Sequence, residues 1–112
     1  MRQSRRSILA GKIESYLGFC LRARKIALGS GSVDMLKKGV YLIIVCSTAS
    51  ENTFKLAIKF KNRFSCPLMI CNAGLENAVH KSGCKVAAVR DKELAQAIVA
   101  NADSDYKLYT ER

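Results

Sequence analysis

The chain has few of the residue types on which metal sites, membrane spans and flexible linkers depend. Its 112 residues include one His, one Pro and no Trp, and nine acidic residues stand against nineteen basic ones. With one Pro and seven Gly, no stretch has the composition of a disordered linker. No apolar run approaches the roughly 20 residues that a membrane-spanning helix needs. These absences predict a cytoplasmic protein. The length of 112 residues predicts a single domain, because it suffices for one core and not for two.

Patterns typical of catalysis or metal binding are also scarce. His80, the only histidine, has no neighbouring Cys or Ser motif that would indicate a nucleophile and its base. Five cysteines are present, and none belongs to a Cys-x-x-Cys pair of the kind that structural zinc sites use. We therefore expect reduced, buried thiols, no metal, no cofactor and no enzymatic activity. A small thiol- or phosphate-handling enzyme is the least favoured alternative.

Positive charge is what the chain has in excess, and its distribution is uneven. The formal net charge is +10. Residues 1–38 carry nine basic and two acidic side chains, residues 39–90 carry seven and two, and residues 91–112 carry three and five. The excess thus lies in the N-terminal and central parts. This asymmetry favours a polyanionic partner, because neutralising phosphates releases condensed counterions, and it predicts binding to nucleic acid.

Apolar periodicity predicts alternating helices and strands. One helix is expected at 8–24 with Ser7 as its cap, and a second from Gly29 that stops at Lys37-Lys38-Gly39. A third is expected through about Arg63 with Thr48 or Ser50 as its cap, and two more at 75–80 and, with Asp91 as its cap, at 92–98. Strands are expected at 26–28, 40–46, 67–71 and 85–90. Strict alternation with apolar strands predicts an α/β fold, a three-layer α/β/α sandwich with a small mixed four-stranded sheet. The domain would cover residues 1–100, and residues 101–112 would be a polar C-terminal tail.

The helix expected after residue 50 has two distinct faces. Leu56, Phe60 and Phe64, with Ala57, are spaced to form its inward stripe. Lys55, Lys59 and Arg63 line up on a neighbouring face. That basic stripe is either an ordinary solvated face or a second electrostatic surface for RNA.

The segment Gly29-Ser30-Gly31-Ser32 opens the second predicted helix. It lacks the third Gly of a dinucleotide-binding loop and the Gly-Lys-Ser/Thr of a P-loop. Small residues at a helix start leave backbone N–H groups open to a phosphate or a base edge. Lys25 comes just before the segment, and Lys37 and Lys38 follow about two helical turns beyond. The segment is therefore either a plain Ser cap with a permissive Gly or a contact point for nucleic acid.

Several short segments, in order over roughly residues 12–100, carry a family resemblance. They are Lys25–Gly29, Leu42–Val45, Thr48–Thr53, Cys66–Met69, Leu75–Ala78 and Lys85–Val89. Together they resemble the kink-turn-binding ribosomal protein superfamily of the L-seven-Ae/L-thirty-e type, and most of all its bacterial ribosomal-protein-like paralogues. The resemblance implies an α/β/α sandwich. It also implies recognition of a kink-turn, a sharply bent RNA with tandem sheared G·A pairs, through its shape, base edges and phosphates.

In this family the RNA lies against the start of the second helix and a loop after the fourth helix. Carried over by position, the implied RNA-binding residues are Lys25, Gly29, Ser30, Gly31, Ser32, Lys37, Lys38, Lys81, Ser82 and Gly83. RNA-binding members carry Gly-x-Asn-Glu-x-x-Lys, whereas this chain has Gly29-Ser30-Gly31-Ser32-Val33-Asp34-Met35. No Asn, Glu or Gln stands at the base-reading positions, and Met35 or Asp34 takes the place of the Lys. Serine cannot bond a base edge bidentately, so we expect reduced selectivity for the G·A pairs.

Two hypotheses for function follow. The first is a monomeric RNA-binding protein that recognises structured, kink-turn-like RNA in or near the ribosome or translation apparatus. The second is a non-catalytic protein-interaction module on the same fold that has lost kink-turn recognition. Both remain open at this point, because a fold does not determine a function.

Overall fold

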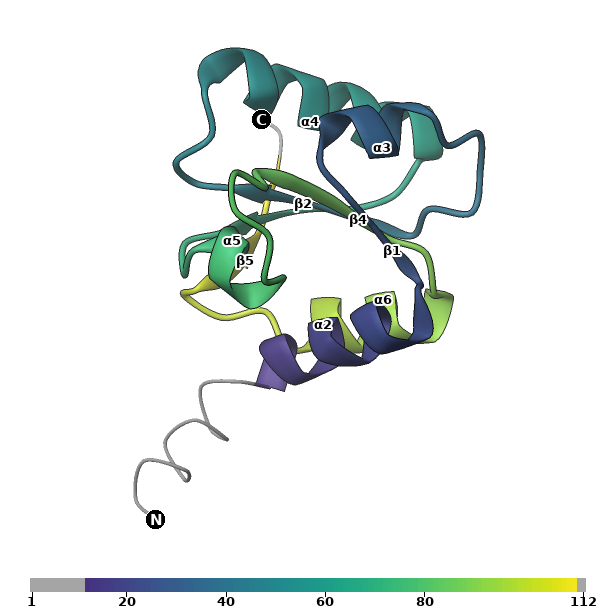
Figure 1. Ribbon diagram of the computed structural model, residues 1–112, viewed down its shortest axis with the longest axis vertical. Helices are drawn as coiled ribbons and strands as arrows, with labels where there is room; N and C mark the ends of the chain where they lie inside the picture. Colours follow the sequence, from purple (N-terminus) through teal and green to yellow (C-terminus); the bar gives the residue numbers. More distant parts are fainter. Residues whose placement is uncertain (1–11, 111–112) are drawn as a thin grey trace.

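The chain folds into a mixed sheet with helices on both of its faces (Figure 1). The computed structural model describes residues 12–110. In chain order its elements are α2 (Lys12–Ala23), β1 (Ile26–Leu28), α3 (Ser30–Asp34), β2 (Leu42–Cys46), α4 (Glu51–Phe64), β3 (Leu68–Cys71), α5 (Leu75–Ala78), β4 (Val86–Val89), α6 (Lys92–Ala100) and β5 (Tyr106–Leu108). The predicted α/β fold is confirmed. None of the helices in this part of the chain is long and apolar enough to cross a membrane.

The sheet has five strands in the order β1-β4-β2-β3-β5. β2 and β3 are parallel, and the other neighbouring pairs are antiparallel. The prediction of four strands is therefore wrong. The additional strand, β5, lies within the segment 101–112 that was expected to be a polar tail.

β5 is held by a turn and by one buried ring. The Asp103 carboxylate accepts hydrogen bonds from the N–H groups of Asp105 and Tyr106, each at 2.9 Å. The Tyr106 side chain is only 1% exposed, and burial of an aromatic ring of this size is strongly favourable. A three-residue strand between acidic residues shows no apolar alternation, so the sequence pattern could not reveal it.

Two apolar clusters, one on each face of the sheet, form the core. On one face Phe60 of α4 and Val33 of α3 pack against Ile43 and Val45, and on the other face α2, α5 and α6 pack against residues such as Ile44. All five residues of β2 are buried, as the continuous apolar run predicted for a central strand covered on both sides.

Two of the predicted helix caps are confirmed. The Ser50 hydroxyl accepts from the Thr53 N–H at 3.1 Å at the start of α4, and the Asp91 carboxylate accepts from the Leu94 N–H at 2.9 Å at the start of α6. The predicted cap at Ser7 and the first residues of the helix expected over 8–24 lie outside the described residues.

α3 is shorter than expected: it ends at Asp34 and does not continue to Lys37 and Lys38. Five residues form too few hydrogen bonds for a helix to be stable alone, so its extent depends on packing. Val33 is fully buried, but the Met35 side chain is 80% exposed and gains little from a further turn. Residues 35–41 leave the helix and lead to the start of β2.

Candidate nucleic-acid interface

Two of the segments predicted to contact RNA meet at one end of the sheet. β1 and β4 are antiparallel neighbours, and the Gly29 N–H donates to the Val86 carbonyl oxygen at 2.8 Å. As a result Gly29–Ser32, which follows β1, lies beside Lys81–Gly83, which precedes β4. We call these two segments together the loop surface.

Gly29 sets the backbone geometry of the loop surface. Its φ of 90° lies in the left-handed region that glycine adopts without strain, and a Cβ added there would meet no atom within 4 Å. The backbone, and not the available space, therefore requires glycine. The N–H groups of the first turn of α3 have no acceptor within the helix, so they can donate hydrogen bonds to a bound ligand.

Lys85 connects the loop surface to two neighbouring elements. Its Nζ donates to Thr48 Oγ1 at 2.9 Å and lies 3.1 Å from Glu76 Oε2. The hydrogen bond from Lys85 lowers the pKa of the Glu76 carboxyl group, and the Gly83 N–H lowers it further. This network fixes the loop on α5. The sequence pattern indicates only a strand at Lys85, because its two partners are far away along the chain.

A small cavity of about 220 Å³ opens beside this network. It is lined by Cys46, whose Sγ lies 3.2 Å from Thr48 Oγ1. Burial on its own would raise the pKa of the Cys46 thiol, but hydrogen bonds from Thr48 and the Leu75 N–H lower it below its usual range. The five cysteines are all buried and free, and burial raises the pKa of the other four. Within residues 12–110 no group of acidic, Cys and His side chains could hold a metal ion.

Asp34, which stands in the motif expected to face RNA, is paired with α4. Its Oδ1 accepts from Arg63 Nη2 at 2.8 Å, and its carbonyl oxygen accepts from Arg63 Nη1 at 3.1 Å. The Arg63 guanidinium also stacks over the Phe60 ring, 5.2 Å from its centroid. The charge of Asp34 is thereby balanced by Arg63. The Arg63 guanidinium binds Asp34 and so does not extend the basic stripe that it was predicted to share with Lys55 and Lys59.

The lysines predicted to accompany Gly29 lie at the other end of the sheet. Lys25 precedes β1, and its carbonyl oxygen accepts from the Arg90 N–H at 2.7 Å. The Arg90 guanidinium donates to the Lys38 carbonyl oxygen at 3.4 Å. A rise of about 3.3 Å per strand residue puts the backbones of Lys25 and Gly29 roughly 13 Å apart. Lys25, Lys37, Lys38 and Arg90 thus form a separate group, which we call the far basic group.

The predicted site is therefore divided between two places. The structure brings together Gly29, Ser30, Gly31, Ser32, Lys81, Ser82 and Gly83, and it separates them from Lys25, Lys37 and Lys38. Lys25 is separated from Gly29 by the length of β1. Lys37 and Lys38 are separated because α3 ends early, after which the chain returns along the sheet until the Tyr41 N–H donates to the Val89 carbonyl oxygen at 2.9 Å. Lys81 and Lys85 are the lysines placed at the loop surface.

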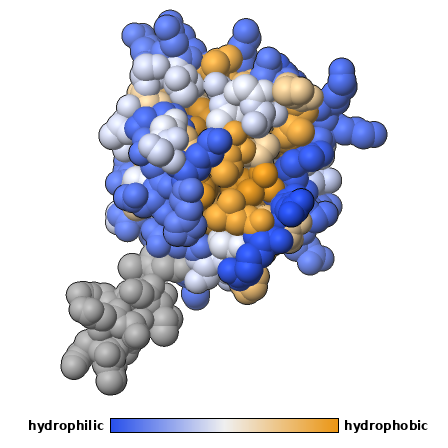
Figure 2. Space-filling view, in the orientation of Figure 1, coloured by the Kyte–Doolittle hydropathy of each residue, from blue (hydrophilic) through white to orange (hydrophobic). Residues whose placement is uncertain are grey.

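β1 runs between the loop surface and the far basic group along an edge of the sheet. Its three residues are all half-buried. Figure 2 shows an apolar area over this strand, bordered by hydrophilic side chains. Apolar areas with polar borders are typical of contact surfaces.

A chain of known structure has a similar fold. It is described as the structure of a protein with unknown function from Bacillus halodurans C, with 26% sequence identity and a TM-score of 0.65 over 80% of this chain and 95% of that chain. No protein-family model matches the sequence, and no curated protein matches it. The comparison supports the α/β fold and gives no activity.

Proposed function

We propose that this protein binds structured RNA through the loop surface, as a relative of the kink-turn-binding ribosomal proteins that acts in or near the translation apparatus. The observation that carries the proposal is the charge arrangement around the loop surface. Glu76 is paired with Lys85, and Asp34 is paired with Arg63. An approaching phosphate would therefore meet N–H groups, hydroxyls and the Lys81 ammonium group, in a protein whose net charge is +10.

The side chains of the loop surface suit base edges as well as phosphates. Ser30, Ser32 and Ser82 carry hydroxyls that both donate and accept hydrogen bonds. Helices on both faces of a mixed sheet agree with the sandwich that the family resemblance implies. Because a single hydroxyl bond replaces a bidentate amide, we expect mutation of the G·A pairs to weaken binding only about three- to tenfold.

A titration at about 150 mM salt tests this proposal, with a kink-turn RNA and a version whose G·A pairs are mutated. The expected result is tighter binding of the kink-turn RNA. Equal affinities would contradict recognition of the kink-turn, and absence of binding to both RNAs would contradict the RNA-binding function itself.

The salt dependence of binding reports how many lysines contact phosphate. If Lys81 makes the only lysine contact, log affinity should fall against log salt with a slope of about −1. If the far basic group also takes part, the slope should approach about −4 to −5. A slope near zero would contradict the proposal.

A further inference from the structure

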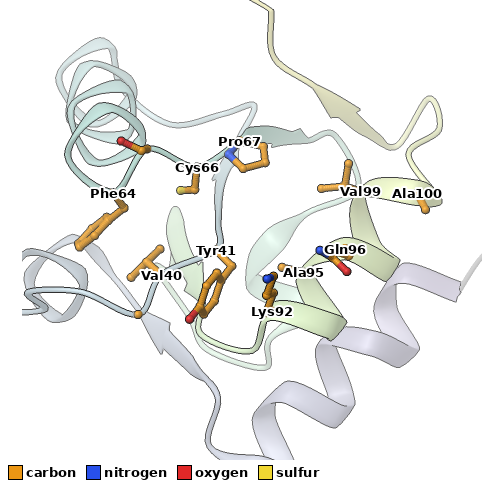
Figure 3. Close-up of a pocket in the computed structure, with 12 residues that line it drawn as sticks. Val40, Tyr41, Phe64, Cys66, Pro67, Lys92, Ala95, Gln96, Val99 and Ala100 are labelled. Carbon is orange, nitrogen blue, oxygen red and sulfur yellow. The ribbon is translucent and has the colours of Figure 1, made fainter.

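A second concave site lies at the end of the sheet opposite the loop surface (Figure 3). It is a pocket of about 610 Å³, open to solvent, at the point where β2 and β3 begin. Tyr41 and Pro67 come from the residues just before these strands, and Phe64 is the last residue of α4. α6 supplies Lys92 and Val99 on the other side. The volume falls within the roughly 300–1,000 Å³ typical of ligand sites.

The lining of this pocket is mainly carbon. Tyr41 is 41% exposed and presents an aromatic ring to solvent, while Phe64 and Val99 are half-buried at either side. Cys66 also lines the pocket, and burial raises the pKa of its thiol to about 11, so that this group is a neutral apolar surface at physiological pH. Such a lining binds bulky apolar side chains and offers them few hydrogen bonds.

The border of the pocket is cationic. Lys92 lines it directly. The Arg90 guanidinium lies close to Gly39 of the pocket lining, since a Cβ added to Gly39 would be 3.3 Å from Arg90 Nη2. It also donates a hydrogen bond to the Lys38 carbonyl oxygen. The far basic group thus adjoins the pocket. Lys61 is near enough to Cys66 to lower the pKa of that thiol against the larger effect of burial.

Acidic side chains do not balance these charges. Among the residues that the structure describes, none of those lining the pocket is acidic. Asp91 is engaged in capping α6 through the Leu94 N–H. Glu93 is exposed one position further along α6 than Lys92 and is not part of the lining. The pocket therefore combines an apolar floor with a net positive border.

Charge disfavours the occupants that the chain itself could provide. Its segment Met1–Gly11 contains three Arg and no acidic residue, so it would bring positive charge to a positive border. A second copy would bring another net charge of +10, and like charges at an interface oppose association. The complementary occupant is a segment with carboxylates beside its apolar side chains.

We propose that this pocket docks an acidic amphipathic segment of a partner protein. A bulky apolar side chain of that segment enters between Tyr41 and Val99, and flanking carboxylates pair with Lys92 and Arg90. Partner docking then leaves the loop surface free, so that one molecule joins a partner protein at one end and RNA at the other. The docking of the partner segment does not depend on the RNA-binding proposal, whereas the joining of partner and RNA rests on it.

Fluorescence anisotropy with a labelled synthetic peptide tests the inference. The probe is a helical peptide with Leu and Phe one turn apart between glutamates, and its control has the glutamates replaced by glutamines. We expect the acidic peptide to bind about tenfold more tightly than the glutamine peptide at about 150 mM salt.

Variants of exposed residues then locate the binding. Tyr41→Ser and Lys92→Glu should each weaken the acidic peptide about five- to tenfold. Matched controls are Phe19→Ser, at a side chain that is 51% exposed on α2, and Lys12→Glu at the start of α2. Both should leave the affinity within about twofold of the unmodified protein.

Three outcomes of the peptide titrations would overturn the inference. They are absence of binding to the acidic peptide, equal affinity for the two peptides, and equal weakening by the pocket variants and their matched controls. Displacement of the peptide by kink-turn RNA, together with weakened RNA binding in Tyr41→Ser, would also overturn it, because the pocket would then belong to the RNA surface.

Discussion

The two ends of the sheet differ in the residue types that they expose. At the loop surface the chain presents glycines, serines and backbone N–H groups, and nearby carboxylates are paired with cations. At the pocket it presents Tyr41, Phe64 and Pro67, and the nearby cations have no acidic neighbour in the lining. The difference follows from the strand ends, since β2 starts after an aromatic residue and is followed by Ser47 and Thr48. One small sheet can therefore support polar recognition at one end and apolar recognition at the other.

Two thiols show the same contrast. Cys46 at the end of β2 has a lowered pKa because hydrogen bonds to Thr48 and the Leu75 N–H outweigh its burial. Cys66 at the pocket has a pKa raised to about 11 because burial outweighs the Lys61 charge. Polar neighbours thus stabilise the Cys46 thiolate, whereas the apolar surroundings of Cys66 favour its neutral thiol.

The largest expected effect is the loss of RNA affinity when a carboxylate is placed in the loop surface. Gly31→Glu should lower RNA affinity on the order of 10- to 100-fold, because it places a carboxylate where a phosphate would approach. A Cβ at Gly31 meets no atom within 4 Å, so the fold should be unaffected. Gly18→Glu, where the added Cβ lies at an ordinary 3.6 Å from Arg22, is the matched control and should bind RNA normally. Equal RNA affinities of the two variants would place the RNA elsewhere.

A second prediction concerns the thiols at the two ends of the sheet and the pH dependence of folding stability. For Cys66 the folded pKa of about 11 exceeds the ordinary 9.0, so the unfolded chain loses its proton first as pH rises. Folding stability should therefore fall between about pH 9 and 11, by on the order of 2 kcal/mol for this thiol. Cys46, whose pKa is lowered, acts in the opposite direction.

Urea unfolding at pH 8 and pH 11 measures this effect. The loss of stability with pH should be smaller in Cys66→Ala than in the unmodified protein, and it should be no smaller in Cys46→Ala. The reverse order for the two variants would show that the electrostatic contrast between the ends is wrong. Cys20, whose pKa is also raised to about 11, contributes equally to all three proteins.

A third prediction concerns the backbone of the loop surface. Gly29→Ala should destabilise the protein by about 1–2 kcal/mol, because its φ of 90° is strained for any residue with a Cβ. Gly31→Ala, at a position without a positive φ, should change the free energy of unfolding by less than about 0.5 kcal/mol or increase it. Thermal or urea unfolding of the two alanine variants checks the difference, and equal stabilities would contradict the geometry assigned to Gly29.

The smallest effect should come from the far basic group. Lys38→Glu should weaken RNA binding by no more than about threefold, whereas Lys81→Glu at the loop surface should weaken it about five- to tenfold. Direct titration of both variants with the same kink-turn RNA measures the ratio. Equal losses would mean that the RNA extends along β1 from one end of the sheet to the other.

The parts of the fold that depend on a few neighbouring residues could be predicted from the sequence. The continuous apolar run of β2, the spacing of Ala57 and Phe60, and the caps at Ser50 and Asp91 each act over a few residues, and each is present as expected. β5 could not be predicted, because it depends on a buried Tyr106 and on pairing with β3, which leave no local pattern.

The candidate site was predictable only in part for the same reason. The segments Gly29–Ser32 and Lys81–Gly83 could be paired from the family resemblance. The place of Lys38 depends on where α3 ends, and the role of Lys85 depends on Thr48 and Glu76 from two other elements. The pocket is assembled from three segments that are separate in the sequence, so no single stretch of residues indicates it.

Backbone amide chemical shifts, recorded while kink-turn RNA is added to the isotopically labelled protein, test the central claim most directly. We predict that the largest shifts fall on Gly29, Gly31, Ser32 and Gly83, and that the amides of Tyr41, Cys66 and Gln96 around the pocket stay unchanged. Large shifts at the pocket with none at the loop surface would contradict the division of the molecule into an RNA-binding end and a partner-binding end.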